Sequence, residues 1–319
     1  MMNGVPAPEA SLRRASWTFD DALREVSACP ACGGALAREG KGALACGDCR
    51  MRFPIRFGIP CMEIDKRTDA LSREVEWYGE GREGVGTGEV RHGEGFHLAH
   101  QKARRAVGDA LLALGASHDW TILSLATGNG VEIPLIEKVS VRIAGVDLSL
   151  VALQEFRTKF PYPVFQGNVR RLPFRDMAFD ACVASGLLHH IVGYDDLTPY
   201  LSEFRRVLRI GGSLVAVEPN SLYPLQWVLG PVNRLVQRIR PGWRGLVPHE
   251  RPVSPWFLTG RMRDAGFGNV RYVGATFLHN RMPLIVGKMV DAFENGARTR
   301  PFVRALAWWT LVTGRREGP

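Results

Sequence analysis

The 319-residue chain lacks any uninterrupted apolar run of the roughly eighteen residues that a bilayer-spanning helix needs. Its first residues, MMNGVPAPEASLRR, also lack the apolar stretch of a signal peptide. These two absences argue against a membrane-spanning protein and against a secreted one. We therefore expect the protein to be made and kept in the cytoplasm.

Acidic residues are scarce in the last third of the chain. Positions 224–319 hold 15 Lys and Arg against 5 Asp and Glu, whereas positions 1–223 hold 26 against 27. The whole net charge of +9 therefore arises after position 223. Such a basic region suits phosphate groups on nucleic acid, on anionic lipid or on a phosphorylated substrate. It is equally typical of an arginine-rich surface that has no specific partner.

Cysteine is also infrequent, but four of the six cysteines fall in a pattern. Cys29 and Cys32 form one Cys-x-x-Cys pair, Cys46 and Cys49 form another, and thirteen residues separate the pairs. Two such pairs can surround a zinc ion with four thiolates and leave no open position for chemistry, which predicts a structural site. Disulfides, the alternative, are rare in cytoplasmic proteins. The segment 25–66 is too short to build its own core, so metal removal should unfold it.

A glycine-containing turn separates two apolar runs near the middle of the chain. The first run, 121–125, is followed by Thr127-Gly128-Asn129-Gly130, and the second, 141–146, delivers Asp147. Small residues let the turn approach a ligand closely, and an acid about twenty residues later can meet ribose hydroxyls. The pattern predicts a βαβ unit that holds a nucleotide-type cofactor. A surface turn could also use glycine and asparagine, so the turn alone does not decide.

Further apolar runs extend this alternation of strands and helices. Expected strands cover 121–125, 141–146, 164–166, 181–184 and 213–217, and expected helices lie near 131–138, 150–159 and 197–208. Alternation of this kind predicts an α/β fold with a parallel sheet that is covered by helices on both faces.

Motifs after the second run point to a known family. They are Gly167-Asn168, Leu172-Pro173-Phe174, Phe179-Asp180, Leu188-His189-His190 and the phrase RVLRIGG at 206–212. With them, positions 96 to 313 resemble a class I S-adenosylmethionine-dependent methyltransferase, most closely the group that includes ubiquinone and menaquinone biosynthesis enzymes. The resemblance implies a Rossmann-like seven-stranded sheet within 96–319, with helices on both faces and an antiparallel strand at its end.

The resemblance also implies where S-adenosylmethionine binds. It places Thr127, Gly128 and Gly130 beside the methionine part, Asp147 on the ribose, Asn168 and Val169 at the adenine edge, and Ser185 past the fourth strand, with Ala126 and Leu148 as further cofactor-binding residues. Two positions depart from the family pattern. Ser124 stands where the family usually has an acid, and Asn168 stands where it usually has Asp. An asparagine can still hydrogen-bond an adenine amine.

The cysteine segment carries a resemblance of its own. Its ending, FPIRFGIP at 53–60, is similar to that of a zinc-ribbon family. That family includes a small partner protein that activates RNA and protein methyltransferases, and it also occurs fused to methyltransferases. The resemblance implies a zinc ribbon fused in cis, which either stabilises the catalytic domain or touches the substrate.

The remaining segments complete the expected organisation. We expect a flexible tail over 1–24, a glycine-rich linker over 67–95 with a lid at its end near Phe96 and His97, and a helical cap over the acceptor at 221–254. The segment 307–313 has the composition of the terminal antiparallel strand, preceded by a helix at 284–293. The alternative is an interfacial membrane anchor over 302–312, whose Trp308 and Trp309 would lie at headgroup level.

Histidines are the candidate catalytic residues. His189 and His190 follow the fourth strand, at the edge where ligands of open α/β sheets bind, and a histidine exchanges protons near neutral pH. Either could act as general base toward a hydroxyl acceptor, or could pack and position the cofactor. His249 with Glu250 is a second candidate pair. Glu218 and Asn220 either line the acceptor pocket or satisfy loop backbone.

These observations favour a cytoplasmic S-adenosylmethionine-dependent methyltransferase acting on a small-molecule or lipid-linked acceptor, at oxygen first and carbon next. One alternative is an RNA methyltransferase that uses the ribbon and the basic last third to hold phosphates. Another, suggested by Ser124, is a catalytically inactive cofactor-binding scaffold. The partners to consider are therefore the acceptor, RNA and a membrane surface, for a monomer or a homodimer.

Overall fold

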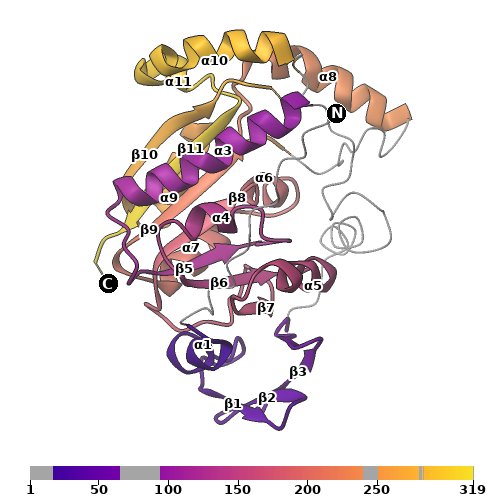
Figure 1. Cartoon of the computed structure of the whole chain (residues 1–319), viewed down its shortest axis with the longest axis vertical. Helices are drawn as coiled ribbons and strands as arrows, with labels where there is room; N and C mark the ends of the chain where they lie inside the picture. Colours follow the sequence, from indigo (N-terminus) through magenta and orange to yellow (C-terminus); the bar gives the residue numbers. More distant parts are fainter. Residues whose placement is uncertain (1–16, 65–93, 240–250, 280–281, 283, 319) are drawn as a thin grey trace, which may run out of the picture.

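A computed structural model describes residues 17–64, 94–239, 251–279, 282 and 284–318 (Figure 1). The expected linker over 67–95 and the second half of the expected cap fall almost entirely outside these residues. The lid end near Phe96 and His97 lies in the first turn of helix α3 (Glu94–Ala113).

A seven-stranded sheet forms the centre of the molecule, as the sequence predicted. Its strands are β5 (Thr121–Leu125), β6 (Arg142–Asp147), β7 (Val164–Gln166), β8 (Phe179–Ser185), β9 (Leu208–Pro219), β10 (Phe267–Thr276) and β11 (Trp309–Arg316). Their order across the sheet is β10-β11-β9-β8-β5-β6-β7. Strands β5 to β9 pair in parallel, whereas β11 runs antiparallel between β9 and β10.

Side chains of the central strands alternate between two apolar clusters, one on each face of the sheet. Leu123 and Cys182 belong to one cluster, while Ile122 and Val183 belong to the other. Because successive side chains of a strand point to opposite faces, this alternation shows that both faces are buried. The fold class is therefore the predicted α/β sheet with helices on both sides.

Helices cover these two faces. The first cluster takes its cover from α7 (Thr198–Val207) and α9 (Pro255–Asp264), and the second from α3, α4 (Ile133–Ile136) and α5 (Leu150–Lys159). The short helix α6 (Leu188–Ile191) follows β8 directly. Helix α5 begins at the N-cap Ser149, whose hydroxyl accepts the N–H of Ala152 at 3.2 Å.

The N-terminal unit contains helix α1 (Phe19–Glu25) and a four-stranded sheet in the order β1-β2-β3-β4. These strands are β1 (Leu36–Glu39), β2 (Ala43–Cys46), β3 (Arg52–Arg56) and β4 (Ile59–Pro60). We expected a flexible tail up to residue 24, but the ordered unit begins by Trp17, which is buried. The physical reason is a capping box between Thr18 and Asp21 that starts the helix.

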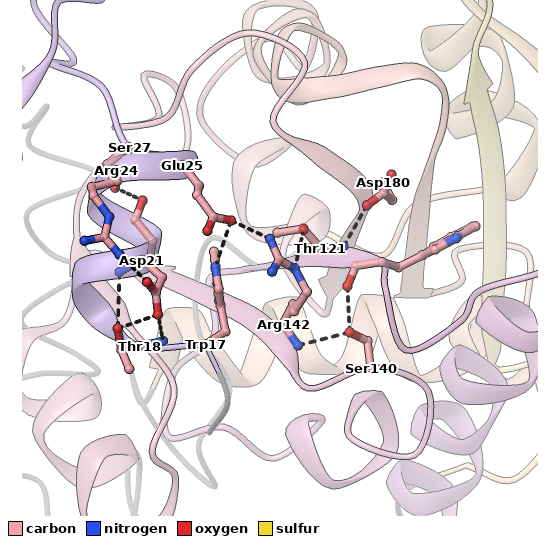
Figure 2. Close-up of polar contacts among 12 residues, drawn as sticks. Trp17, Thr18, Asp21, Arg24, Glu25, Ser27, Thr121, Ser140, Arg142 and Asp180 are labelled. Carbon is pink, nitrogen blue, oxygen red and sulfur yellow. Dashed lines mark hydrogen bonds and ion pairs between the residues drawn. The ribbon is translucent and has the colours of Figure 1, made fainter. Parts of the chain in front are cut away.

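This unit packs against the β7 edge of the large sheet. Glu25 accepts the indole N–H of Trp17 at 3.1 Å and pairs with Arg142 of β6 at 2.5 Å (Figure 2). The N–H of Met62 donates to the carbonyl of Gln166 at 2.7 Å, and the N–H of Ala28 donates to that of Pro173 at 3.0 Å. Trp17, Leu23 and Phe53 join the same apolar cluster as Phe165 and Phe174. The two parts thus share one core.

The last third adds α8 (Pro224–Ile239), α10 (Leu284–Thr299) and α11 (Pro301–Arg304). Figure 1 shows α8 and α10 at the end of the long axis opposite the ribbon. The expected helix at 284–293 and the terminal strand are confirmed. The anchor alternative for the tryptophan pair is wrong, since Trp308 and Trp309 are each 6% exposed and belong to the core. None of the helices in the described residues has the length and apolar content to cross a bilayer.

Candidate functional site

The four paired cysteines meet in the N-terminal unit. Their sulfur atoms all lie within 4.8 Å of one another, with Cys29 and Cys49 at 3.6 Å and Cys32 and Cys46 at 3.5 Å. A tetrahedron with Zn–S bonds of about 2.3 Å has edges of about 3.8 Å, so the donor set and its spacing fit a structural zinc ion.

The glycine turn after β5 has the backbone conformation that its sequence suggested. Gly128 and Gly130 have φ angles of 50° and 81°. A Cβ at Gly130 would come within 2.8 Å of both the Phe156 and the Phe160 ring, so no other residue fits there without rearrangement. A Cβ at Gly128 would meet nothing within 4 Å, so the turn is closely packed at Gly130 only.

Asp147, at the end of β6, faces this turn. Its carboxylate accepts the N–H of Gly128 at 2.8 Å and that of Ser149 at 2.8 Å. Burial raises the pKa of Asp147 above its ordinary value, and the backbone donors counteract that effect. The structure thus brings the acid to the glycine turn, where the sequence placed a ribose-binding carboxylate.

The other expected cofactor residues lie along the same edge of the sheet. Asn168 and Val169 are buried just beyond β7, and the side-chain oxygen of Asn168 accepts the N–H of Arg170 at 2.9 Å. The carbonyl of Leu148 accepts the amide of Gln166 at 3.1 Å. Ser185 closes β8, while Ala126 and Thr127 follow β5. Ligands of open α/β sheets bind at this carboxyl edge.

A buried carboxylate stands beside Ser124, the position that departs from the family pattern. The Ser124 hydroxyl donates to Glu132 at 2.5 Å, and the Thr127 hydroxyl approaches the same oxygen at 3.4 Å. Burial raises the pKa of Glu132, and the charge of Arg104 opposes that rise. An acid is thus present beside the end of β5, although it comes from the segment before α4. The sequence analysis missed Glu132, because an acid after a glycine turn usually belongs to a solvated helix start.

His189 and Glu218 form a buried pair at the ends of β8 and β9. Nδ1 of His189 lies 2.7 Å from Oε2 of Glu218, and both side chains are almost fully buried. Glu218 also accepts the backbone N–H groups of Leu187 at 3.0 Å, Leu188 at 2.8 Å and His189 at 3.3 Å. A carboxylate only accepts, so Nδ1 carries a proton, and in the neutral imidazole Nε2 is then the nitrogen with the lone pair.

The other polar candidates have different surroundings. The ring of His190 lies 4.0 Å from that of His189 between centroids. The side chain of Asn220 donates to the carbonyls of Ala305 at 2.7 Å and Ala307 at 2.8 Å, so it joins β9 to the chain before β11. His249 and Glu250 lie outside the described residues.

The rings of His189 and Trp309 both lie close to Gly186. A Cβ built on Gly186 would lie 3.7 Å from Cε1 of His189 and 3.9 Å from the Trp309 ring. Trp309 in turn meets the ring of His100 edge-on, with centroids 5.0 Å apart. Gly186 therefore presents bare backbone to both rings. Neither His100 nor Trp309 was predicted to lie near the active site, because a histidine in an amphipathic helix and a tryptophan in a strand carry no signal for such a position.

Comparisons with known proteins agree with this geometry. A family described as a methyltransferase domain matches residues 123–216. The chain is 34% identical over 176 residues to a demethylmenaquinone methyltransferase of Mycobacterium sp. (strain KMS), covering 51% of this chain and 74% of that protein. It is 34% identical over 124 residues to the Chlorobaculum parvum demethylmenaquinone methyltransferase, covering 38% and 47%. This chain thus spans about half the length of the latter.

The fold also matches solved structures. A methyltransferase from Thermotoga maritima, described as a possible histamine N-methyltransferase, aligns with a TM-score of 0.50 and 19% identity over 70% of this chain and 93% of that one. At this identity the match supports the fold alone.

Proposed function

Because the chain belongs to the class I S-adenosylmethionine-dependent methyltransferases, we propose that it methylates a small-molecule or lipid-linked acceptor at a hydroxyl oxygen. The observation that carries this proposal is the buried pair of His189 and Glu218 at the carboxyl edge of the sheet. The cofactor would be held by the turn at 126–130, by Asp147 and Leu148, by Asn168 and Val169, and by Ser185. When bound, S-adenosylmethionine supplies the activated methyl group.

The pair is suited to remove a proton from the acceptor. The carboxylate of Glu218 accepts the Nδ1–H of His189 and so fixes the orientation of the imidazole. In the neutral ring, Nε2 is then the basic nitrogen. Nε2 takes the hydroxyl proton of the acceptor, and the acceptor oxygen becomes an oxyanion nucleophile. The imidazolium that forms is stabilised by the carboxylate at 2.7 Å, and its proton then passes to solvent.

The relatives bear on the kind of acceptor. They are named demethylmenaquinone methyltransferases, which suggests a hydroxylated aromatic ring on a lipid tail. An ionised ring hydroxyl shares its charge with the neighbouring ring carbon, so the same base could also serve methylation at carbon. We propose oxygen rather than carbon as the methylated atom. Methylation at carbon also requires the loss of a proton from the ring, and the proposed mechanism has only one base to accept protons.

The test uses the zinc-loaded protein with methyl-labelled S-adenosylmethionine and a panel of acceptors. The panel contains hydroquinones with and without prenyl tails, their singly O-methylated forms, and transfer RNA. We expect label on the oxygen of a free hydroquinone, located by mass spectrometry and NMR. Label on a ring carbon would correct the position, whereas transfer to RNA alone would contradict the proposal.

A binding measurement separates lack of activity from lack of cofactor. Calorimetric titration with S-adenosylmethionine should show binding in the same preparation. Binding without transfer to any member of the panel would support the scaffold alternative. The orientation of His189 by a buried carboxylate supports transfer, because it is the arrangement that a general base needs.

A further inference from the structure

We propose that helices α8 and α10 form a docking face for an anionic lipid bilayer. The face consists of Trp227, Leu235 and Ile239 in α8 and Ile285, Met289 and Phe293 in α10, and we call it the outer face. Each of these side chains is more than half exposed. Soluble surfaces carry single exposed apolar residues as a rule, and a gathering of six large ones calls for a partner.

Helix α10 is oriented by contacts on its inner side. Glu294 is buried, pairs with Lys102 of α3 at 2.5 Å and accepts the N–H of Phe277 at 2.7 Å. Because this pair fixes the inner side, the outer-face residues of α10 are turned away from the core. They recur every four residues and thus form one stripe along the helix.

Helix α8 presents a similar stripe. Leu235 and Ile239 are four residues apart, and Trp227 lies eight residues before Leu235, within the same third of the helix circumference. Tyr223, just before the helix, is buried and stacks on His279. The start of α8 is therefore fixed to the core while its stripe faces outward. Figure 1 shows α8 and α10 at the same end of the molecule.

The cationic residues near the outer face favour an anionic bilayer as its partner. Arg238, Lys288 and Arg300 are exposed on or beside these helices, and the buried acid Glu294 is already paired. Positions 224–254 hold five arginines and one acid. An apolar stripe flanked by cations suits a bilayer with anionic headgroups, where apolar side chains enter the headgroup boundary and cations meet phosphates. A second copy of the chain would instead bring like charges together.

The position of the outer face relates it to the candidate active site. Tyr223 also contacts Trp308, with ring centroids 5.4 Å apart, and the next residue, Trp309, pairs with Pro219 at the end of β9. The start of α8 therefore lies near the carboxyl end of β9, where Glu218 of the His189 pair stands. Docking on a bilayer would set where the protein works, whatever the acceptor and whether or not His189 is the base.

The test is co-sedimentation with vesicles of phosphatidylcholine alone and with about a third phosphatidylglycerol. We expect the full-length, zinc-loaded protein to bind the anionic vesicles, and about 0.5 M NaCl to release most of it. Brominated acyl chains should quench tryptophan fluorescence, and Trp227→Phe should reduce that quenching.

Three variants locate the binding. Combining Ile285→Gln, Met289→Gln and Phe293→Gln should lower the vesicle partition coefficient at least about tenfold. Arg238→Gln with Lys288→Gln should lower it about fivefold for each cation removed. A matched control combines Leu112→Gln, Met177→Gln and Ile210→Gln, three exposed apolar residues outside both helices, and should leave partition unchanged.

Three outcomes would overturn the proposal. They are no binding of the wild type to anionic vesicles, equal loss of binding in the α10 variant and the matched control, and a concentration-dependent dimer that the α10 variant abolishes. The last result would assign the outer face to self-association. Circular dichroism on every variant excludes unfolding, and the exposed sites make correct folding the expectation.

Discussion

Replacement of Glu218 by glutamine tests the proposed base most directly. The carboxylate now accepts four hydrogen bonds, two on each oxygen. A glutamine can keep the Leu187 and Leu188 N–H groups on its single oxygen. Its NH2 group then faces the backbone N–H of His189, which loses its acceptor, and Nδ1 of His189, which must become an acceptor to keep a hydrogen bond. The proton moves to Nε2, and the base loses its lone pair.

The size of the effect follows from that change of tautomer. General-base catalysis contributes about 10²–10⁴ in rate, so Glu218→Gln should lower kcat by that factor. Loss of charge-assisted hydrogen bonds, worth about 1.5–3 kcal/mol each, should also destabilise the fold by a few kcal/mol. Binding of S-adenosylmethionine should stay within about threefold, which is less than 1 kcal/mol, because the cofactor residues lie on other strands.

The assay follows label transfer from S-adenosylmethionine at saturating acceptor over a pH range of about 6 to 9, with calorimetry of cofactor binding. The matched control is Glu203→Gln, a less buried glutamate, which binds Arg206 and the N–H of Leu172 away from the pair. It should lose stability without losing rate. In a His189→Ala background, Glu218→Gln should add little further loss. Unchanged kcat in Glu218→Gln, or full additivity with His189→Ala, would refute the reasoning.

Three further predictions concern the cofactor and zinc sites. Asp147→Ala removes the acceptor of the Gly128 and Ser149 N–H groups, so calorimetry should show at least about tenfold weaker S-adenosylmethionine binding; unchanged affinity would contradict the ribose assignment. The raised pKa of Glu132 means that the native state binds its proton more tightly than the unfolded chain. Stability should therefore fall as pH rises from the ordinary value of 4.5 toward the raised one, and thermal melts of Glu132→Gln should lose that slope. Chelation of zinc, or Cys46→Ser, should lower the melting temperature of the whole protein, because the ribbon shares the core of the sheet; a separate early transition with the main one unmoved would contradict this.

The central sheet could be predicted from the sequence because its strands are buried on both faces. Such strands read as short continuous apolar runs, and five of them matched strands β5 to β9 within a few residues, apart from the ends of β9. The meeting of His189 with Glu218 could also be predicted, since His189 follows β8 and Glu218 lies at the end of the neighbouring parallel strand β9. The hydrogen bond between His189 and Glu218 could not be predicted, because it depends on the turn that leads into α6.

Contacts between distant segments could not be predicted. Glu25 and Arg142 are 117 residues apart, and nothing in either local sequence marks them as partners. The same holds for Met62 on Gln166, through which the ribbon reaches the loop that carries Asn168. Of the two roles that the resemblance implied for the ribbon, these contacts favour stabilisation of the catalytic domain. The ribbon lies at the opposite end of the long axis from α8 and α10 (Figure 1).

The inactive-scaffold alternative rested on Ser124, which stands where the family usually has an acid. The buried carboxylate of Glu132 weakens that argument. A serine at the end of β5 has a hydroxyl that donates to this carboxylate at 2.5 Å, whereas an aspartate there would set a second negative charge against it. Serine and Glu132 therefore make a compatible pair, and serine at this position places a carboxylate beside the turn instead of removing one. The departure from the family pattern is compensated within the site, so it gives no independent support to loss of activity.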